Sequence, residues 1–216
     1  PRKEGFSTKQ LLRRFGVPFT MLIFCALLCV YIYRLPKAVR EPLPVLMYHH
    51  LVEDGQDCND MTVTPSKLRS DLETILALGY TPVLPRELAA GDALPEKPIL
   101  ITFDDGYLSN YEYAWPILEK YGMVATIFMV GSTTGNTEHY KDTAYPITPH
   151  FSYEQGAEMV ASGVISLQSH TYDMHQWGPY ESTDQPRETI LPLEGESEAD
   201  YRASLSADCQ KIRQAS

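Results

Sequence analysis

The fold of this chain is decided by the stretch Ile99-Leu100-Ile101-Thr102-Phe103-Asp104-Asp105-Gly106, an apolar run that leads directly into two carboxylates and a glycine. A second apolar run, Val164-Ile165-Ser166-Leu167, is followed closely by Ser169-His170-Thr171-Tyr172-Asp173-Met174-His175. Short apolar runs of this kind are typical of buried parallel strands. Both polar groups would then lie at strand carboxyl ends, where α/β folds place their active sites.

The residue types in these two stretches are those of a mononuclear metal site with a free carboxylate beside it. Neighbouring strand residues point to opposite faces, so Asp104 and Asp105 do not suit a glycosidase pair that acts on one bond. Before Gly106 the chain can turn, and one carboxylate can bind a metal while the other faces a bound water. His170 and His175 complete a ligand set that suits zinc, and also cobalt, nickel, iron or manganese. A plain Asp-Asp-Gly turn and two exposed histidines are the alternative interpretation.

Apolar runs and helical patterns alternate on both sides of the first stretch. Thr64 can cap a helix that has Pro65 in its first turn and Gly79 at its end. Pro116, inside the helix expected over 111–121, predicts a kink or a late start. The expected strands cover residues 45–48, 80–84, 99–103, 125–130 and 164–168, and further helices cover 152–161 and a segment from about 198 onward. This alternation predicts βα units around a parallel sheet, open or closed.

The last expected helix begins at Ser197–Asp200, which resembles a capping box. Tyr201, Leu205 and Cys209 follow at four-residue spacing, so Cys209 is expected on the inner face together with Leu205 and Ile212. Four or five strands do not close a barrel, so the fragment is expected to stop inside its domain.

The charge of the chain is divided between its two parts. The 216 residues carry a net charge of −10, yet residues 1–40 hold eight of the 18 Lys/Arg and one of the 28 acidic residues. A composition of 44% hydrophobic and 21% charged residues is typical of one globular domain of moderate size. Residues 1–40 are basic and the rest of the chain is acidic. This argues against a nucleic-acid partner, because a nucleic-acid binder spreads positive charge over a groove-sized face.

Residues 17–33 (VPFTMLIFCALLCVYIY) have no charged side chain and reach about the lower length limit for a helix that spans a bilayer. Lys and Arg are more numerous before this run than directly after it, which favours a cytoplasmic N-terminus. We therefore expect a basic cytoplasmic tail over 1–16, a transmembrane signal anchor over 17–33, a Pro-rich stalk over 34–44 and an extracytoplasmic domain over 45–216 of a single-pass cell-membrane protein. A cleaved signal peptide and a buried helix of a soluble protein are the alternatives.

Thr102–Gly106 and the Ser-His-Thr-x-x-x-His run at 169–175 resemble the first two motifs of the polysaccharide deacetylases, carbohydrate esterase family 4 with its NodB homology domain. Pro44–His49 resembles the opening strand of that family, and the resemblance extends over about residues 44–215. It implies a distorted (β/α) barrel. By motif matching, Asp104 would be the general base, and the metal ligands would be Asp105, His170 and His175.

The same resemblance implies hydrolytic removal of N-acetyl groups from an extracytoplasmic amino-sugar polysaccharide, with one divalent metal ion, zinc first, as cofactor. The opening strand is similar to the branch that acts on poly-N-acetylglucosamine, while peptidoglycan and chitin enzymes share the core motifs. An O-acetyl esterase acting on a glycan and a non-catalytic glycan-binding module are the alternatives. The family's base-orienting arginine and general-acid histidine would follow residue 216, so this chain alone is expected to hold an incomplete active site.

Three further residues are candidates for contact with the substrate or with the metal ligands. His49 ends the first strand at the same rim and can contact the cleft or a ligand. Tyr107 and Tyr172 can stack on sugar rings, and the backbone N–H of Tyr107 can stabilise the oxyanion of a tetrahedral intermediate. Packing in the core or in loops is the alternative for each of the three. The sequence identifies no protein partner.

Overall fold

The computed structural model describes residues 25–27, 30–31 and 42–215. Of the segment expected to span a membrane, residues 25–27 and 30–31 are helical, and the rest lies outside the described residues, as do the basic tail and most of the stalk. Among the residues described, no helix has the length and the apolar composition that crossing a bilayer requires.

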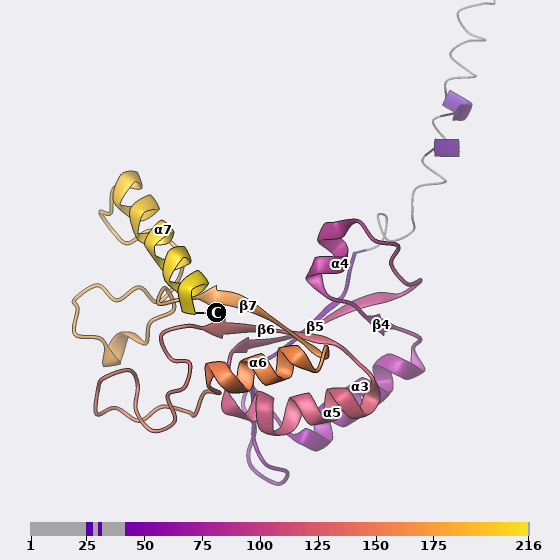
Figure 1. The fold of residues 1–216 in the computed structure, drawn as a ribbon, viewed down its shortest axis with the longest axis horizontal. Coiled ribbons are helices and arrows are strands. Elements are labelled where there is room, and N and C mark those ends of the chain that lie inside the picture. Colours follow the sequence, from indigo (N-terminus) through magenta and orange to yellow (C-terminus); the bar gives the residue numbers. More distant parts are fainter. Residues whose placement is uncertain (1–24, 28–29, 32–41, 216) are drawn as a thin grey trace, which may run out of the picture. The chain divides into compact units, whose positions relative to one another are not determined.

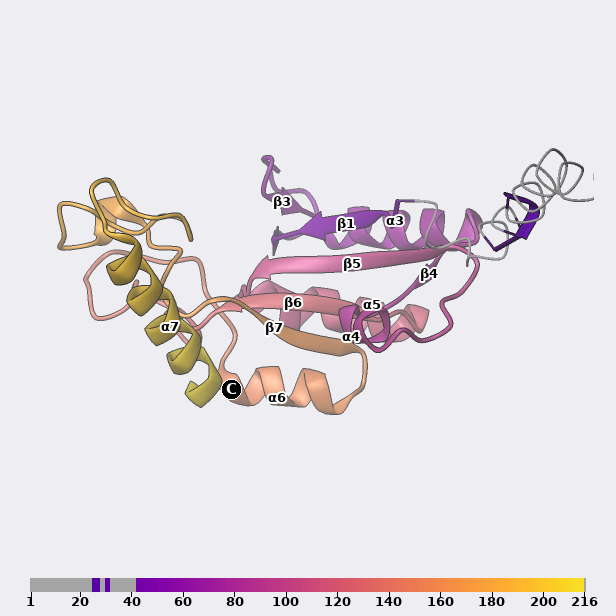
Figure 2. The ribbon, with the colours of Figure 1, turned by 90° about the horizontal axis from the view of Figure 1, so that it is seen from above.

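A parallel sheet forms the centre of the domain (Figures 1 and 2). Its main path runs through β1 (Val45–Tyr48), β5 (Pro98–Asp105), β6 (Ala125–Val130) and β7 (Ile165–Thr171), and the short β4 (Thr81–Pro82) pairs with the start of β5. All of these pairings are parallel. The carboxyl ends of β5, β6 and β7 therefore meet at one edge, and the predicted α/β class is confirmed.

Helices cover one side of the sheet and extend beyond its end. Figure 1 shows α3 (Pro65–Ala77), α5 (Trp115–Tyr121) and α6 (Tyr153–Ala161) together on one side. The helix α7 (Glu198–Ala215) lies beyond the carboxyl end of β7 (Figures 1 and 2). The shorter elements are α4 (Pro85–Ala90), the parallel strands β2 (His50–Leu51) and β3 (Thr62–Val63), a π-helical turn η3 (Asn110–Ala114) and a 3-10 turn η4 (Gly178–Tyr180).

The hydrophobic core lies between the sheet and the helices on that side. Leu68 and Leu72 of α3 recur at four-residue spacing and are both 0% exposed, as expected for the inner face of an amphipathic helix. They belong to the same buried cluster as Phe103 of β5, Leu118 of α5 and Ile127 of β6. Burial of each such side chain contributes roughly 2 kcal/mol to the free energy of folding. This core holds β5 and β6 in place and so positions the residues at their carboxyl ends.

The predicted starts of the helices are confirmed. Thr64, Ser152 and Ser197 each accept, through the side-chain oxygen, the backbone N–H of the residue three positions on, at 3.2, 3.3 and 3.2 Å. These bonds satisfy N–H groups that have no partner inside the helix. α5 begins at Trp115, directly after the π-helical turn, and this is the late start that Pro116 predicts.

The inner face of α7 differs from the prediction. Cys209 is exposed, so its expected inward position is wrong, whereas Asp208 and Ile212 are buried and Leu205 is partly buried. The error has a geometric cause: repeated four-residue steps drift around a helix of 3.6 residues per turn, by about 80° over eight residues. The buried face of α7 recurs at alternating steps of three and four residues, and one of its residues is the carboxylate Asp208.

Candidate metal centre

Asp105 leaves the regular strand geometry at the end of β5. Its φ is 71°, in the left-handed region that non-glycine residues rarely adopt, and Gly106 follows with a φ of 85°. A Cβ on Gly106 would lie 3.2 Å from the Cβ of Met129, so this turn passes close to the neighbouring strand β6. Residues held in sparsely populated backbone regions are concentrated at functional sites.

His170 lies in β7 at a point where the register with β6 shifts. Ser169 pairs with Met129 and Thr171 pairs with Val130, so His170 is the extra residue of a β-bulge. A bulge breaks the alternation of a strand and re-aims the side chain that it carries. The strand is thus longer than the predicted 164–168, and the bulge sets the direction of the imidazole.

His175 lies in the turn that follows β7. Thr171 Oγ1 accepts the N–H of Met174 at 3.0 Å, and the buried Met174 side chain fixes this turn to the domain. The Nδ1 of His175 lies 3.0 Å from the backbone carbonyl oxygen of Glu188. Because a carbonyl oxygen only accepts, Nδ1 donates, and the Nε2 of the neutral ring is left free to bind a metal.

The three predicted ligands converge in the structure. The Nε2 atoms of His170 and His175 each lie 3.6 Å from Oδ1 of Asp105, and the two rings are 5.0 Å apart at an angle of 84°. This Oδ1 is buried and has no hydrogen-bond partner within the described part of the chain. Bonds of about 2.1 Å to a tetrahedral ion place neighbouring ligand atoms roughly 3.4 Å apart. The three side chains therefore fit one divalent ion between them.

Asp104 is half-buried beside this group. Burial raises the pKa of its carboxyl above the ordinary value, and nearby His170 and His49 partly oppose that shift by favouring the charged form. A carboxylate with a raised pKa is the stronger base, which suits a group that accepts a proton during a reaction. The predicted base and the predicted ligands thus lie together at the end of β5.

Comparison with known proteins agrees with this geometry. Residues 91–215, more than half of the chain, match the family model described as "Polysaccharide deacetylase". This chain belongs to the polysaccharide deacetylase family.

Two curated relatives illustrate how much of such proteins the chain covers. YxkH of Bacillus subtilis (strain 168) is 39% identical over 135 residues, which are 61% of this chain and 43% of that protein. The poly-beta-1,6-N-acetyl-D-glucosamine N-deacetylase of Escherichia coli (strain K12) is 26% identical over 186 residues, which are 77% of this chain and 27% of that protein. The chain therefore spans less than half the length of either relative.

Solved structures of the same kind resemble the fold. IcaB from Ammonifex degensii aligns with a TM-score of 0.59 and 29% identity, over 78% of this chain and 65% of that chain. The BpsB deacetylase domain from Bordetella bronchiseptica aligns with a TM-score of 0.55 and 28% identity, over 80% of this chain and 75% of that chain.

In this polysaccharide deacetylase domain, Tyr107 lies between two histidine rings. Its ring centroid is 5.1 Å from that of His50 and 5.0 Å from that of His150. Burial, and after it the negative charge of Asp105, raises the pKa of the Tyr107 phenol, so the hydroxyl stays protonated. The Nδ1 of His50 is in turn 2.8 Å from Ser109 Oγ. Tyr107 is therefore held in a packed layer beside the candidate ligands.

The structure gives the other two candidates packing and anchoring contacts. The backbone carbonyl of His49 accepts a hydrogen bond from Asn110 Nδ2 at 2.8 Å. The ring of Tyr172 lies close to Gly131, where an added Cβ would be 2.6 Å from Tyr172 Cδ2, and Lys211 Nζ of α7 lies 5.4 Å from the ring centroid. Substrate contact by His49 or Tyr172 stays a prediction.

Sequence reasoning missed the segment 186–196, which supports His175. Glu188 supplies the carbonyl described above, and the neighbouring Arg187 pairs with Gln176 through the bonds Gln176 N–H to Arg187 O (2.9 Å) and Arg187 N–H to Gln176 Oε1 (2.6 Å). Arg187 Nη2 also lies 2.5 Å from Glu196 Oε1. Every residue has a backbone carbonyl, so no residue type could have identified Glu188 in advance.

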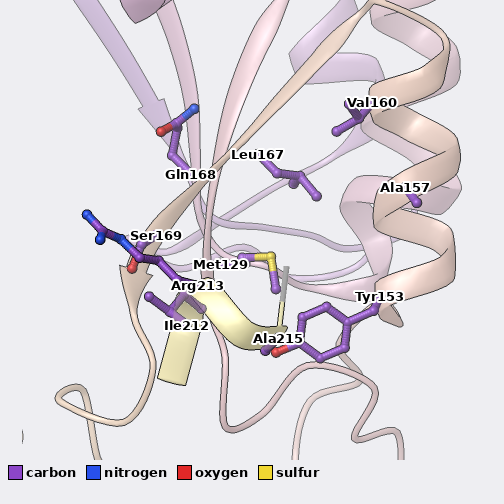
Figure 3. Close-up of a pocket in the computed structure, with 10 residues that line it drawn as sticks. All are labelled: Met129, Tyr153, Ala157, Val160, Leu167, Gln168, Ser169, Ile212, Arg213 and Ala215. Carbon is purple, nitrogen blue, oxygen red and sulfur yellow. The ribbon is translucent and has the colours of Figure 1, made fainter. Parts of the chain in front are cut away.

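A separate cavity of about 460 Å³ lies between β6, β7, α6 and the end of α7 (Figure 3). It is lined by Met129, Tyr153, Ala157, Val160, Leu167, Gln168, Ser169, Ile212, Arg213 and Ala215. Most of these side chains are apolar. None of the three candidate metal ligands lines the cavity, so it is distinct from the metal centre.

Proposed function

We propose that this chain carries the metal-binding part of a metal-dependent deacetylase that hydrolyses N-acetyl groups of a polysaccharide. The observation that carries the proposal is the convergence of Asp105, His170 and His175, with both Nε2 atoms 3.6 Å from one buried carboxylate oxygen. One carboxylate and two imidazoles leave coordination positions for water and substrate, as a catalytic site requires. The proposed activity is that of the whole protein.

One divalent ion is assigned to these three side chains. Imidazole nitrogen and carboxylate oxygen suit zinc, with cobalt, nickel, iron and manganese as alternatives. When bound, such an ion supplies Lewis-acid polarisation of a water molecule and of the acetyl carbonyl. The hydrogen bond from His175 Nδ1 to the Glu188 carbonyl supports the assignment, because metal-binding histidines commonly donate their second ring nitrogen in this way.

The neighbouring groups are assigned to the proton and to the developing charge. Asp104 accepts a proton from the water molecule while the water oxygen forms a bond to the acetyl carbon. The backbone N–H of Tyr107 donates to the carbonyl oxygen as that oxygen gains negative charge. The C–N bond then breaks, which releases acetate, and the leaving amine takes up one proton, balanced by the proton that Asp104 accepted from the water. The half-buried position of Asp104, beside the candidate ligands, supports its role as the base.

The proposed substrate is an N-acetylated amino-sugar polymer of the poly-N-acetylglucosamine kind. The name of the Escherichia coli relative supports this choice, at 26% identity. Trp177, two residues after His175, is 60% exposed and offers an aromatic face on which a sugar ring can stack. Peptidoglycan and chitin-like polymers are the other N-acetylated candidates.

The finer architecture and the location are also proposals. A distorted (β/α) barrel is supported by the parallel strand order β1-β5-β6-β7 and by the alignment with IcaB. An extracytoplasmic location, with a membrane anchor over 17–33, is supported by the apolar composition of that segment and the basic residues before it.

The decisive experiment compares the full-length protein with its Asp105→Ala/His170→Ala double variant. The wild type should retain about one divalent ion per chain and release acetate from acetylated glucosamine oligomers, in a reaction that a chelator stops and zinc restores. The double variant should lose both the metal, measured by elemental analysis, and the acetate release.

Each other outcome has a distinct meaning. Stoichiometric metal in the double variant would contradict the ligand assignment. Acetate from O-acetylated glycans alone would indicate an esterase. Glycan binding without acetate release from any glycan would indicate a non-catalytic module.

A further inference from the structure

Asp208 is a buried carboxylate that the proposed mechanism does not use. It lies on the inner face of α7 and is 8% exposed. Its Oδ2 accepts the backbone N–H of Tyr172 at 2.8 Å, and its Oδ1 accepts the backbone N–H of Asp173 at 2.6 Å. Both carboxylate oxygens therefore accept hydrogen bonds from the turn that joins His170 to His175, although Asp208 lies 35 residues after Asp173 in the chain.

Side-chain oxygens accept the backbone amides of this turn. Three consecutive amides, those of Tyr172, Asp173 and Met174, are each accepted by a side-chain oxygen, two by Asp208 and the third by Thr171 Oγ1. β7 ends at Thr171, and one further backbone bond, from Ser132 N–H to the Tyr172 carbonyl at 2.7 Å, links the start of the turn to the segment after β6. Asp208 is therefore one of the groups that fix the path of the backbone between the two candidate ligands, and it is the one that accepts two of the three amides.

The contacts around α7 fix that carboxylate in turn. Ile212, one helical turn after Asp208, is buried, and its Cδ1 would lie 2.8 Å from a Cβ on Gly131, just after β6. Gly131 N–H donates to the carbonyl of Thr171 at 3.0 Å. A buried carboxylate is costly unless it is hydrogen-bonded, and bonds from amides to a charged acceptor are about twice as strong as neutral ones. This side chain therefore couples the helix to the backbone of the histidine turn.

We propose that Asp208 is a positioning residue for the metal centre: by accepting the amides of Tyr172 and Asp173, it holds the turn that sets His175 against Asp105 and His170. The inference rests on the metal site proposed above. Asp208 lies beyond the three side chains that would touch the ion, and it acts on the backbone between two of them. Its loss should therefore weaken metal binding while leaving the ligand set complete.

The test uses Asp208→Asn and Asp208→Ser in the full-length protein. The asparagine side chain keeps the volume of aspartate, but its NH₂ group, which only donates, would face one of the two amides. The serine side chain is shorter and offers a single oxygen in place of the two carboxylate oxygens. Zinc affinity of the metal-free protein, measured by competition with a chromophoric chelator, should fall about 10–100-fold in either folded variant, with kcat reduced more than KM is raised. The melting temperature of the metal-free protein separates this effect from unfolding.

Glu198→Gln is the matched control. It removes one negative charge from the same helix at an exposed position paired with Arg202, and it touches no part of the turn. It should keep the zinc affinity of the wild type. Zinc affinity within twofold of the wild type in Asp208→Asn and in Asp208→Ser would overturn the proposal.

Amide hydrogen exchange of the metal-free protein separates this inference from the proposed function. The amides of Tyr172 and Asp173 should exchange faster in Asp208→Asn than in the wild type and in Glu198→Gln. Unchanged exchange would show that Asp208 does not hold the turn. If the wild type binds no zinc but Asp208→Asn still speeds exchange at Tyr172 and Asp173, the proposed metal site is rejected. The conclusion that Asp208 holds the turn would then stand.

Discussion

Asp104 and Asp105 carry the same chemical group on neighbouring residues, yet their surroundings separate their tasks. Asp105 adopts a φ of 71° and places a buried oxygen, unpaired within the described residues, 3.6 Å from two imidazole nitrogens. Asp104 stays in the strand and is half-buried, and burial raises its pKa. At the scale of single residues, this difference in environment supports the proposed roles, with Asp105 as a metal ligand and Asp104 as the base.

Asp104→Asn in the full-length protein is predicted to remove turnover and keep the metal. Asparagine has nearly the same volume but is not a base, so kcat for acetate release should fall about 10²–10⁴-fold. The zinc dissociation constant should stay close to that of the wild type, because the three proposed ligands are intact. Asp92→Asn, at an exposed position, is the control and should change neither quantity. Near-native turnover in Asp104→Asn would refute its assignment as the base.

At the scale of elements, the site depends on how closely α7 approaches the ends of β6 and β7. Gly131 and Ser132 donate their backbone N–H groups to the carbonyls of Thr171 and Tyr172, at 3.0 and 2.7 Å. A Cβ on Gly131 would lie 2.6 Å from Tyr172 Cδ2 and 2.8 Å from Ile212 Cδ1. A side chain at this position would therefore separate the helix from the histidine turn.

Gly131→Ala is accordingly predicted to lower the free energy of unfolding by about 1–3 kcal/mol, as overpacking of a filled contact does. Urea unfolding of the metal-free protein measures this change. The same substitution should cost less in an Ile212→Val background, because valine lacks the Cδ1 that the new methyl group meets. Equal costs in the two backgrounds would contradict the close packing of α7 described here.

The elements also show what a linear pattern can predict. The helix starts at Thr64, Ser152 and Ser197 were predictable because each cap bonds to an amide three residues away. The bulge at His170 was not, because it exists only in the register between β7 and β6. The exposure of Cys209 was mispredicted because repeated four-residue steps drift around a helix of 3.6 residues per turn, so Cys209 does not share a face with Tyr201.

At the scale of the whole domain, a buried histidine ties folding to pH. His150 is 6% exposed, and its ring packs 5.0 Å from that of Tyr107. Burial lowers the pKa of His150 from 6.5 to about 4. Between these values the unfolded chain binds a proton that the folded protein does not. The stability that the fold gains from a neutral His150 is therefore fully present above pH 6.5. The free energy of unfolding decreases by this amount as the pH falls from 6.5 toward 4.

His150→Gln is predicted to flatten this dependence. Because a difference of one pKa unit corresponds to about 1.4 kcal/mol, the wild type should lose up to about 3 kcal/mol more unfolding free energy than the variant between pH 8 and pH 4. Urea unfolding in the presence of a chelator measures the two slopes without a contribution from metal. His139→Gln, at an exposed position, should keep the slope of the wild type. Parallel curves for wild type and His150→Gln would contradict the assignment of this pH dependence to His150.

The order of residues alone predicts the alternation of strands and helices, the helix caps, and the grouping of Asp104, Asp105, His170 and His175 into one candidate set. The assembly of this set depends on contacts that exist only in the folded chain. These are the left-handed turn at Asp105, the bulge at His170, the carbonyl of Glu188 and the buried carboxylate of Asp208. The difference lies in how far apart along the sequence the interacting residues are. Caps and periodicity arise from hydrogen bonds and burial within a few residues, whereas register, bulges and buried charges depend on segments that only the packed core brings together.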